Sequence, residues 1–278
     1  AKEPDRIQSF LRTACTLFAA VLVGIGCGRD LSADELLRKA MESAANGDWK
    51  KSLSYARNAY DKASDSPAAI IMYALALENN DQLDEAASRM RRLEENVDSF
   101  MAQYTLGRML FKQGKIDRSI RPLTNALAKK PDDPDTLLLL ARANADRKRD
   151  DAIDYYKRLS KTERFRGSAI PHNEIGVLYL LNGKRGQAAF ELQCALGLDA
   201  DNPEIVLNNA ILNDYHSSSP SSAGSAKKYY NRFIDPARNR PELTKDYAAV
   251  SNRLHAIRRP RHVPPHPGRR SRPATPAA

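Results

Sequence analysis

Apolar and polar residues alternate along this chain with the period of an α-helix, in segments that come in pairs. The clearest pair lies in residues 104–131. Its first segment places Leu106 and Leu110 on one helical face, and Gly114 then interrupts the pattern. A second apolar stripe follows and ends at Pro131. The pattern predicts two antiparallel helices joined by a tight turn.

The same pattern returns in residues 173–203. Gly176 stands where Gly107 stands in the clearest pair, and Ala188 stands where Ser119 stands. Two antiparallel helices approach closely only where neither helix places a large side chain at the crossing. We therefore expect these small residues to mark the points where the helices cross.

Small residues recur at a nearly fixed interval along the whole chain. The positions are Ser52, Ala86, Ser119, Ala152, Ala188 and Ala226. The intervals between them are 34, 33, 33, 36 and 38 residues, a period typical of helical repeats. An ordinary helix bundle is the alternative, but it gives no reason for six matched small residues.

The remaining units follow the pattern less closely. Three of them occupy residues 33–67, 68–98 and 134–165. Asp81 stands where a turn glycine is expected, and a Ser/Pro-rich stretch, Ser217 to Ser225, interrupts the sixth unit, which begins at Glu204. Residues 241–258 read as one more amphipathic helix. We expect that helix to cover the end of the stack, which otherwise leaves apolar surface in water.

The pairs at 104–131 and 173–203 resemble tetratricopeptide repeats. That family places a Leu-Gly pair, a Tyr-like residue, a small residue, an aromatic or aliphatic residue, Ala and Pro in this order. The resemblance implies an all-α fold, a right-handed superhelical solenoid of about six antiparallel helix pairs with a C-terminal capping helix. It also implies a binding surface and no reaction centre.

In this repeat family the first helix of each pair lines a concave groove that holds proteins or peptides. Carried over position by position, the resemblance implies that the groove is lined by Tyr104, Arg108, Phe111, Leu138, Arg142, Asn173 and Val177. Aromatic, guanidinium and amide groups together suit an extended peptide or a helix of some acidic character. The alternative for each side chain is a place in the core or a pairing within the solenoid.

The first 26 residues have the pattern of an export signal. A basic start precedes an apolar run, residues 13–26, which is too short to span a bilayer comfortably. Small residues followed by Cys27 resemble the bacterial lipoprotein signal, which implies cleavage before Cys27 and its acylation. Because Gly28 is not acidic, the resemblance favours an outer-membrane anchor facing the periplasm. The alternatives are a plain signal peptide and an uncleaved short anchor.

The net charge of +10 is unevenly distributed. The six arginines of residues 258–278 supply +6 and residues 1–26 supply +1, which leaves +3 for residues 27–257. This distribution argues against a nucleic-acid-binding domain. The Arg/Pro-rich tail is expected to be disordered, and could touch an anionic lipid or polymer through charge alone. The alternative is a solvated terminus with no partner.

We divide the chain into a signal (1–26), a linker (27–32), a repeat domain (33–258) and a tail (259–278).

Residues that carry chemistry do not form a recognisable catalytic motif. The five histidines lack metal-ligand spacing, and no phosphate-binding glycine loop or nucleophile elbow is present. Asp132, Asp133 and Asp135 flank Pro134, where acids cap a helix. Cys194 is expected to be a small buried apolar residue. We therefore expect no enzyme, no cofactor and no metal site.

The sequence as a whole predicts a non-enzymatic scaffold lipoprotein that binds protein partners in a bacterial cell-envelope assembly of the pilus, outer-membrane or cell-wall type. One alternative is a soluble or exported adaptor that uses the same groove without a lipid anchor. A third class, a polyanion-binding protein acting through its basic tail, would show strongly salt-dependent binding.

Overall fold

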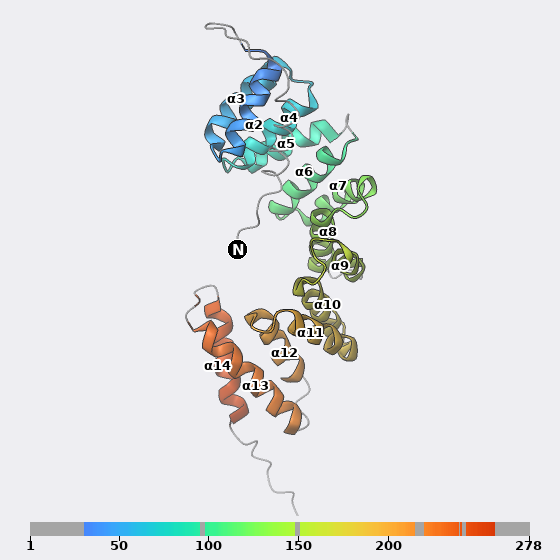
Figure 1. Ribbon diagram of the computed structural model, residues 1–278, viewed down its shortest axis with the longest axis vertical. Coiled ribbons are helices and arrows are strands. Elements are labelled where there is room, and N and C mark those ends of the chain that lie inside the picture. The colour runs from blue at the N-terminus through green and yellow to red at the C-terminus, as the bar shows by residue number, and fades with distance from the viewer. Residues whose placement is uncertain are drawn as a thin grey trace, which may run out of the picture. The chain divides into compact units, whose positions relative to one another are not determined.

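The computed structural model describes residues 31–94, 98–147, 151–214, 220–238, 240 and 243–258, and these ranges contain thirteen helices and no strand (Figure 1). The first helices of the pairs are α2 (Ala33–Ala45), α4 (Pro67–Glu78), α6 (Phe100–Lys112), α8 (Pro134–Asp146), α10 (Ala169–Leu181) and α12 (Pro203–Asp214). The second helices are α3 (Trp49–Lys62), α5 (Leu83–Glu94), α7 (Ile116–Lys129), α9 (Asp151–Lys161), α11 (Arg185–Leu198) and α13 (Pro220–Ala237). A last helix, α14 (Thr244–Arg258), follows them. Within these ranges, none of the helices has the length and apolar character that a membrane crossing requires.

The first helices begin at polar caps that the sequence supplies. Ser32 accepts a hydrogen bond from the backbone N–H of Glu35, whose side chain bonds the Ser32 N–H in return. The cap residues of the other first helices are Ser66, Ser99, Asp133, Ser168 and Asn202. Each cap satisfies a backbone N–H that the helix itself leaves without a partner. The capping role predicted for the Asp132–Asp135 cluster is confirmed at Asp133, which accepts from the N–H of Thr136 at 3.0 Å.

The turn within a pair uses a residue in the left-handed backbone region. Gly114 has a φ of 70° between α6 and α7. Asp81, which replaces the expected glycine between α4 and α5, has a φ of 62°. Aspartate is one of the few non-glycine residues that adopts this conformation readily. Asp81 therefore preserves the tight turn that the repeat pattern predicts.

Glycine at the helix crossing allows the two helices of a pair to approach closely. A Cβ atom added to Gly107 would lie 2.6 Å from Cγ of Leu123, and one added to Gly176 would lie 2.6 Å from Cγ of Leu192. Both distances are too short for two carbon atoms, so any larger residue would push the helices apart. The expectation that small residues mark the crossings is confirmed at Ser119, which is fully buried on α7.

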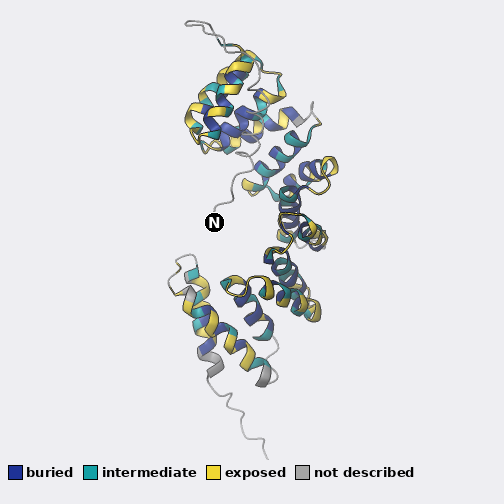
Figure 2. Ribbon diagram, in the orientation of Figure 1, coloured by how far each residue is buried: buried dark blue, intermediate teal, exposed yellow. Residues whose placement is uncertain are grey.

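The helices group into two compact units. The N-terminal unit ends at Arg166, and each of its helices packs against the next. Buried residues face one another between these helices (Figure 2). The largest fully buried side chains of this unit are Leu77, Met90, Leu106, Met109, Leu123, Leu137, Leu140, Tyr156 and Leu159. Buried apolar side chains thus line the contacts between successive helices, as in repeat proteins.

The C-terminal unit begins at Gly167 and contains α10 to α14. Its last helix contributes Val250 and Leu254 to a buried cluster with Phe233 of α13. The edge of this cluster is held by Asp214, which accepts hydrogen bonds from Tyr230 at 3.0 Å and from Arg253 at 2.5 Å. The predicted helix at 241–258 is therefore present as α14, and it covers α13.

The sixth unit differs from the expectation. Residues 220–225 of the stretch expected to interrupt the repeat form the first turns of α13, because Pro220 suits the start of a helix. Residues 215–219 lie outside the described residues. The predicted signal (1–26), Cys27 and the tail (259–278) also lie outside them, so their assignments stay predictions.

Candidate protein-binding surface

Within each unit the first helices lie closer to one another than the second helices do. In the N-terminal unit α2 contacts α4, α4 contacts α6, and α6 contacts α8; in the C-terminal unit α10 contacts α12. Contacts between successive second helices are absent or slight in the described ranges. A stack of helix pairs with this spacing bends toward its first helices. The first helices therefore form the inner surface of each unit.

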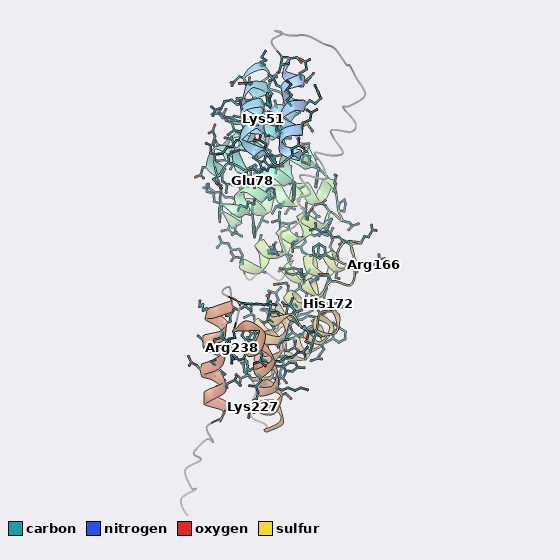
Figure 3. The ribbon with its side chains drawn as sticks, turned by 60° about the vertical axis from the view of Figure 1, so that its left-hand side comes forward. Lys51, Glu78, Arg166, His172, Lys227 and Arg238 are labelled. Atoms are coloured by element: carbon teal, nitrogen blue, oxygen red, sulfur yellow. The ribbon has the colours of Figure 1, made fainter. Side chains whose placement is uncertain are left out.

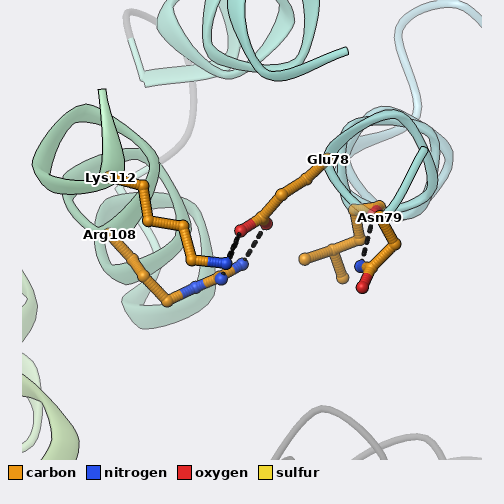
Figure 4. Close-up of polar contacts among 5 residues, drawn as sticks. Glu78, Asn79, Arg108 and Lys112 are labelled. Atoms are coloured by element: carbon orange, nitrogen blue, oxygen red, sulfur yellow. Dashed lines mark hydrogen bonds and ion pairs between the residues drawn. The ribbon is translucent and has the colours of Figure 1, made fainter. Parts of the chain in front are cut away.

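A buried carboxylate holds two cations on the inner surface of the N-terminal unit. Glu78, the last residue of α4, accepts hydrogen bonds from Arg108 of α6 and, at 2.6 Å, from Lys112 (Figure 4). The side chain of Glu78 is 4% exposed, and the side chains of Arg108 and Lys112 are 12% and 53% exposed. The three residues form a clamp that joins two consecutive first helices.

The clamp sets the ionisation of its carboxylate. Burial alone would raise the pKa of Glu78, but the charges and hydrogen bonds of Arg108 and Lys112 outweigh burial and hold that pKa below its ordinary value. Glu78 is therefore ionised at neutral pH and neutralises one of the two cations. Arg108 was predicted to face a partner; the structure instead gives its guanidinium an internal carboxylate.

The other residues predicted for the groove of the N-terminal unit differ in exposure. Tyr104 and Phe111 are half-buried on α6, and the Tyr104 ring stacks on Phe100 with a centroid separation of 5.6 Å. Leu138 is 6% exposed on α8, so it belongs to the core and offers a partner almost no surface. Arg142 of α8 is exposed and forms no ion pair with another described residue. Arg142 is thus the predicted groove residue of this unit that is best placed to meet an anion.

The inner surface of the C-terminal unit is apolar around a pair of amides. Asn173 of α10 is 4% exposed, and its carbonyl oxygen accepts a hydrogen bond from Nδ2 of Asn208 at 2.9 Å. Val177 is half-buried one turn further along α10. Ile170 and Leu181, at the two ends of α10, are 47% and 76% exposed. This surface could receive apolar side chains, whereas the surface of the N-terminal unit presents a cation.

A histidine and a glutamate are paired between α10 and α11. His172 of α10, labelled in Figure 3, places Nδ1 2.7 Å from Oε2 of Glu191 on α11, within hydrogen-bond distance. Among the described residues, no three His, Cys, Asp or Glu side chains come together in a way that could hold a metal ion. The described parts of these surfaces consist of interhelical contacts and open helix faces.

Sequence reasoning missed Glu78 and the exposed ends of α10. Glu78 is the one acid in an otherwise apolar segment, residues 67–78, and it precedes Arg108 by thirty residues, close to one repeat. An acid and a base separated by about one repeat are a usable signal for an ion pair between equivalent helices. No sequence signal indicated that Leu181 is exposed, because an apolar residue at the end of a helix is expected to be buried.

Comparisons with known proteins agree with this architecture. Residues 104–163 match the family described as tetratricopeptide repeat. No curated protein matches the chain. The structure of YrrB, a TPR protein with an unusual peptide-binding site, is similar over 70% of this chain and 95% of its own, with a TM-score of 0.56 and 15% identity.

Two further solved structures share the fold. Pseudomonas aeruginosa pilF is similar over 80% of this chain and 97% of its own, with a TM-score of 0.61 and 13% identity. MamA from Desulfovibrio magneticus RS-1 is similar over 61% of this chain and 96% of its own, with a TM-score of 0.55 and 18% identity. The family match over residues 104–163, the paired helices and these shared folds lead to one conclusion: the chain has the fold of tetratricopeptide-repeat proteins.

Proposed function

We propose that this protein is a non-enzymatic scaffold that binds a peptide or protein segment along the inner surface of its first helices. Proteins built from tetratricopeptide repeats are generally non-catalytic scaffolds. The observation that carries the proposal is Arg142, an exposed cation on an inner helix that forms no ion pair with another described residue. A guanidinium group in that state is available to a carboxylate of a partner.

The partner is an extended or helical segment with acidic and apolar side chains that lies on the inner surface of the N-terminal unit. An acidic side chain would meet Arg142, and an apolar side chain would meet the half-buried rings of Tyr104 and Phe111 on α6 of the same unit. YrrB, whose fold is similar, is described as having a peptide-binding site, and this supports a peptide as the ligand here. A fold alone does not determine the ligand, so the charge and the apolar residues carry the argument.

A charge reversal at Arg142 tests the inner surface. Arg142→Glu should weaken capture of the partner in a crosslinking pull-down from a native envelope fraction, while the circular dichroism spectrum stays unchanged. Arg121→Glu is the matched control, because Arg121 is exposed on the second helix α7 and the charge change is identical. Arg108 is unsuitable, since a glutamate there would lie against Glu78. If the two variants capture the partner equally well, the proposal that this surface binds the partner is wrong.

We also propose that the protein acts in the bacterial cell envelope, attached through a lipid at Cys27. The basic start, the apolar run and the small residues before Cys27 support this placement. Cys27→Ser should release the protein from membranes and abolish lipid labelling. Cys194→Ser is the matched control and should change neither. If the Cys27 variant fractionates like the wild-type chain, the protein is better explained as an adaptor without a lipid anchor.

A further inference from the structure

The outer face of α11 differs from the outer faces of the other second helices. Two residues after the small crossing residue, α11 carries Phe190, whose side chain is 68% exposed. The equivalent residues of the other second helices are Ser54, Ser88, Arg121, Asp154 and Lys228, all exposed. One turn later α11 carries Cys194, where the others carry Asn58, Arg92, Asn125, Arg158 and Arg232. Comparison of equivalent positions in the six second helices therefore shows that the outer face of α11 is the one that carries Phe190 and Cys194 in place of polar residues.

The apolar residues of α11 form a stripe. Gly186, Phe190, Cys194 and Gly197 fall within about 80° of one another around the helix at 100° per residue. Leu198, 47% exposed, flanks the end of this stripe. No charged residue lies within the stripe. Exposed apolar surface with no internal partner marks an interaction site.

No close contact within the described residues requires glycine at the two glycine positions of the stripe. A Cβ atom added to Gly186 or to Gly197 would meet nothing within 4 Å, in contrast to Gly107 and Gly176. A glycine inside a helix costs about 0.8–1 kcal/mol relative to alanine. Close approach by another backbone is the remaining physical reason for a glycine at such a place. This observation is independent of the exposure of Phe190.

We propose that the occupant of this face is the same face of a second copy of the chain. With a two-fold axis between Gln193 and Cys194, two antiparallel α11 helices place Phe190 opposite Gly197 of the partner subunit. The large side chain of one copy thereby meets the small residue of the other, twice, as a two-fold interface requires. The small residues let the two helices approach closely enough for the Phe190 ring to be buried.

Charge complementarity favours a second copy over other occupants. The stripe itself is uncharged, with Lys184 and Arg185 at the start of α11 and Asp199 and Asp201 just after its end. The Asp201 side chain is 96% exposed although Arg232 lies 2.9 Å away. Antiparallel pairing brings the basic end of each copy to the acidic end of the other. A lipid surface is disfavoured, because Asp199 and Asp201 would be repelled by anionic headgroups.

The strength of the dimer follows from its size. A single pair of helices buries less than the roughly 1,600 Å² of a standard interface. We therefore expect a reversible dimer whose stability depends mainly on Phe190, because one buried aromatic residue commonly dominates a small interface. The proposal concerns the outer face of α11 and does not depend on the inner surface discussed above.

Sedimentation velocity of the full 278-residue chain carrying Cys15→Ser and Cys27→Ser tests the proposal. The chain should show a concentration-dependent equilibrium of monomer and dimer. Phe190→Arg should weaken dimerisation about thirtyfold or more. Arg121→Ser, at the equivalent place on α7, should leave dimerisation unchanged. All variants should keep the same circular dichroism spectrum, because both side chains are exposed.

A second measurement places the contact. A short bismaleimide should link Cys194 to Cys194 of the partner subunit, and Phe190→Arg should abolish the product. A chain that is monomeric at all concentrations, or a dimer that Phe190→Arg leaves intact, would overturn the proposal. Binding to phosphatidylethanolamine–phosphatidylglycerol vesicles that requires Phe190, by a chain that is monomeric in solution, would also overturn it and assign the face to lipid.

Discussion

The pairs α6–α7 and α10–α11 have the same helix crossing in their interior. Gly107 faces Leu123 in one pair and Gly176 faces Leu192 in the other, with the same 2.6 Å approach to a hypothetical Cβ atom. The equivalent residues are separated by 69 positions in every case. A shared crossing of this kind is what lets the two helices of each pair approach closely, so it is fixed by the fold.

The surfaces of the two pairs differ at nearly every exposed position. On the inner side, Arg108 of α6 corresponds to Val177 of α10. On the outer side, Arg121 of α7 corresponds to Phe190 of α11. The fold does not require these differences, because the interiors match. Function in this chain is therefore expected to lie in the residues at which otherwise equivalent repeats disagree.

The largest expected effect comes from removing both cations of the clamp. Arg108→Met with Lys112→Met leaves Glu78 buried without a partner and should cost about 3–5 kcal/mol of unfolding free energy. Adding Glu78→Gln should recover most of the loss, because no charge then remains buried. Trp49, the single tryptophan, lies in the N-terminal unit, so its fluorescence during urea unfolding reports on that unit.

Val177→Ala is the matched variant in the C-terminal unit. Val177 occupies the place of Arg108 but is half-buried and uncharged, so its truncation should cost only about 1 kcal/mol. Circular dichroism reports on the helices of both units, so a transition that it shows and that Trp49 fluorescence does not show belongs to the C-terminal unit. If Val177→Ala lowers the unfolding free energy as much as the double variant does, the ion pairs of the clamp contribute no more stability than ordinary side-chain packing.

The second-largest expected effect on unfolding stability comes from the glycines at the helix crossings, and it tests whether the two crossings are equivalent. Gly107→Ala and Gly176→Ala should each destabilise the protein by about 1–3 kcal/mol, since the added methyl group overlaps a leucine. Gly186→Ala should instead stabilise α11 by up to about 1 kcal/mol, because nothing lies near its Cβ position. Urea unfolding followed by circular dichroism measures all three. Opposite signs for the two crossing glycines would contradict a shared interior.

The third effect is a dependence of the unfolding stability of the N-terminal unit on pH. The folded-state pKa of Glu78 is lowered, so its contribution is fully present above the ordinary glutamate pKa of about 4.3 and is lost as pH falls through the lowered folded-state pKa. The stability difference between the wild-type chain and Glu78→Gln should therefore be largest near neutral pH and shrink in acid. Trp49 fluorescence at a series of pH values measures it. A difference that grows in acid would mean that the pKa of Glu78 is raised.

The smallest effect concerns the outer faces. Phe190→Ala and Arg121→Ala should each change unfolding stability by less than about 0.5 kcal/mol, because both side chains are exposed. The comparison should be made at a protein concentration low enough to keep the chain monomeric. A loss of several kcal/mol for Phe190→Ala would place its ring in the core of the monomer.

The sequence predicted the repeat architecture because local rules determine it. Gly114 ends a helix, Asp133 caps one, and Asp81 substitutes for a turn glycine, and each of these follows from its own chemistry and position. The tertiary pairing of Glu78 with Arg108 could not be predicted in this way, because it joins helices thirty residues apart.

Exposure was harder to predict than secondary structure. Apolar residues occur all around α11, so periodicity does not show which side of it is covered. Leu138 and Phe190 therefore carry the same apolar signal, although Leu138 is 6% exposed and Phe190 is 68% exposed. Only the packing of neighbouring helices separates them. The candidate surface consequently needed the structure, whereas the fold did not.

The central claim is that the inner surface of the first helices holds a partner. The most direct test is photo-crosslinking in living cells with a photoreactive amino acid at position 142, compared with the same group at position 121 on the outer face. We predict a discrete adduct with another protein from position 142 and none of that mass from position 121. The same adduct from both positions, or none from position 142, would contradict the claim.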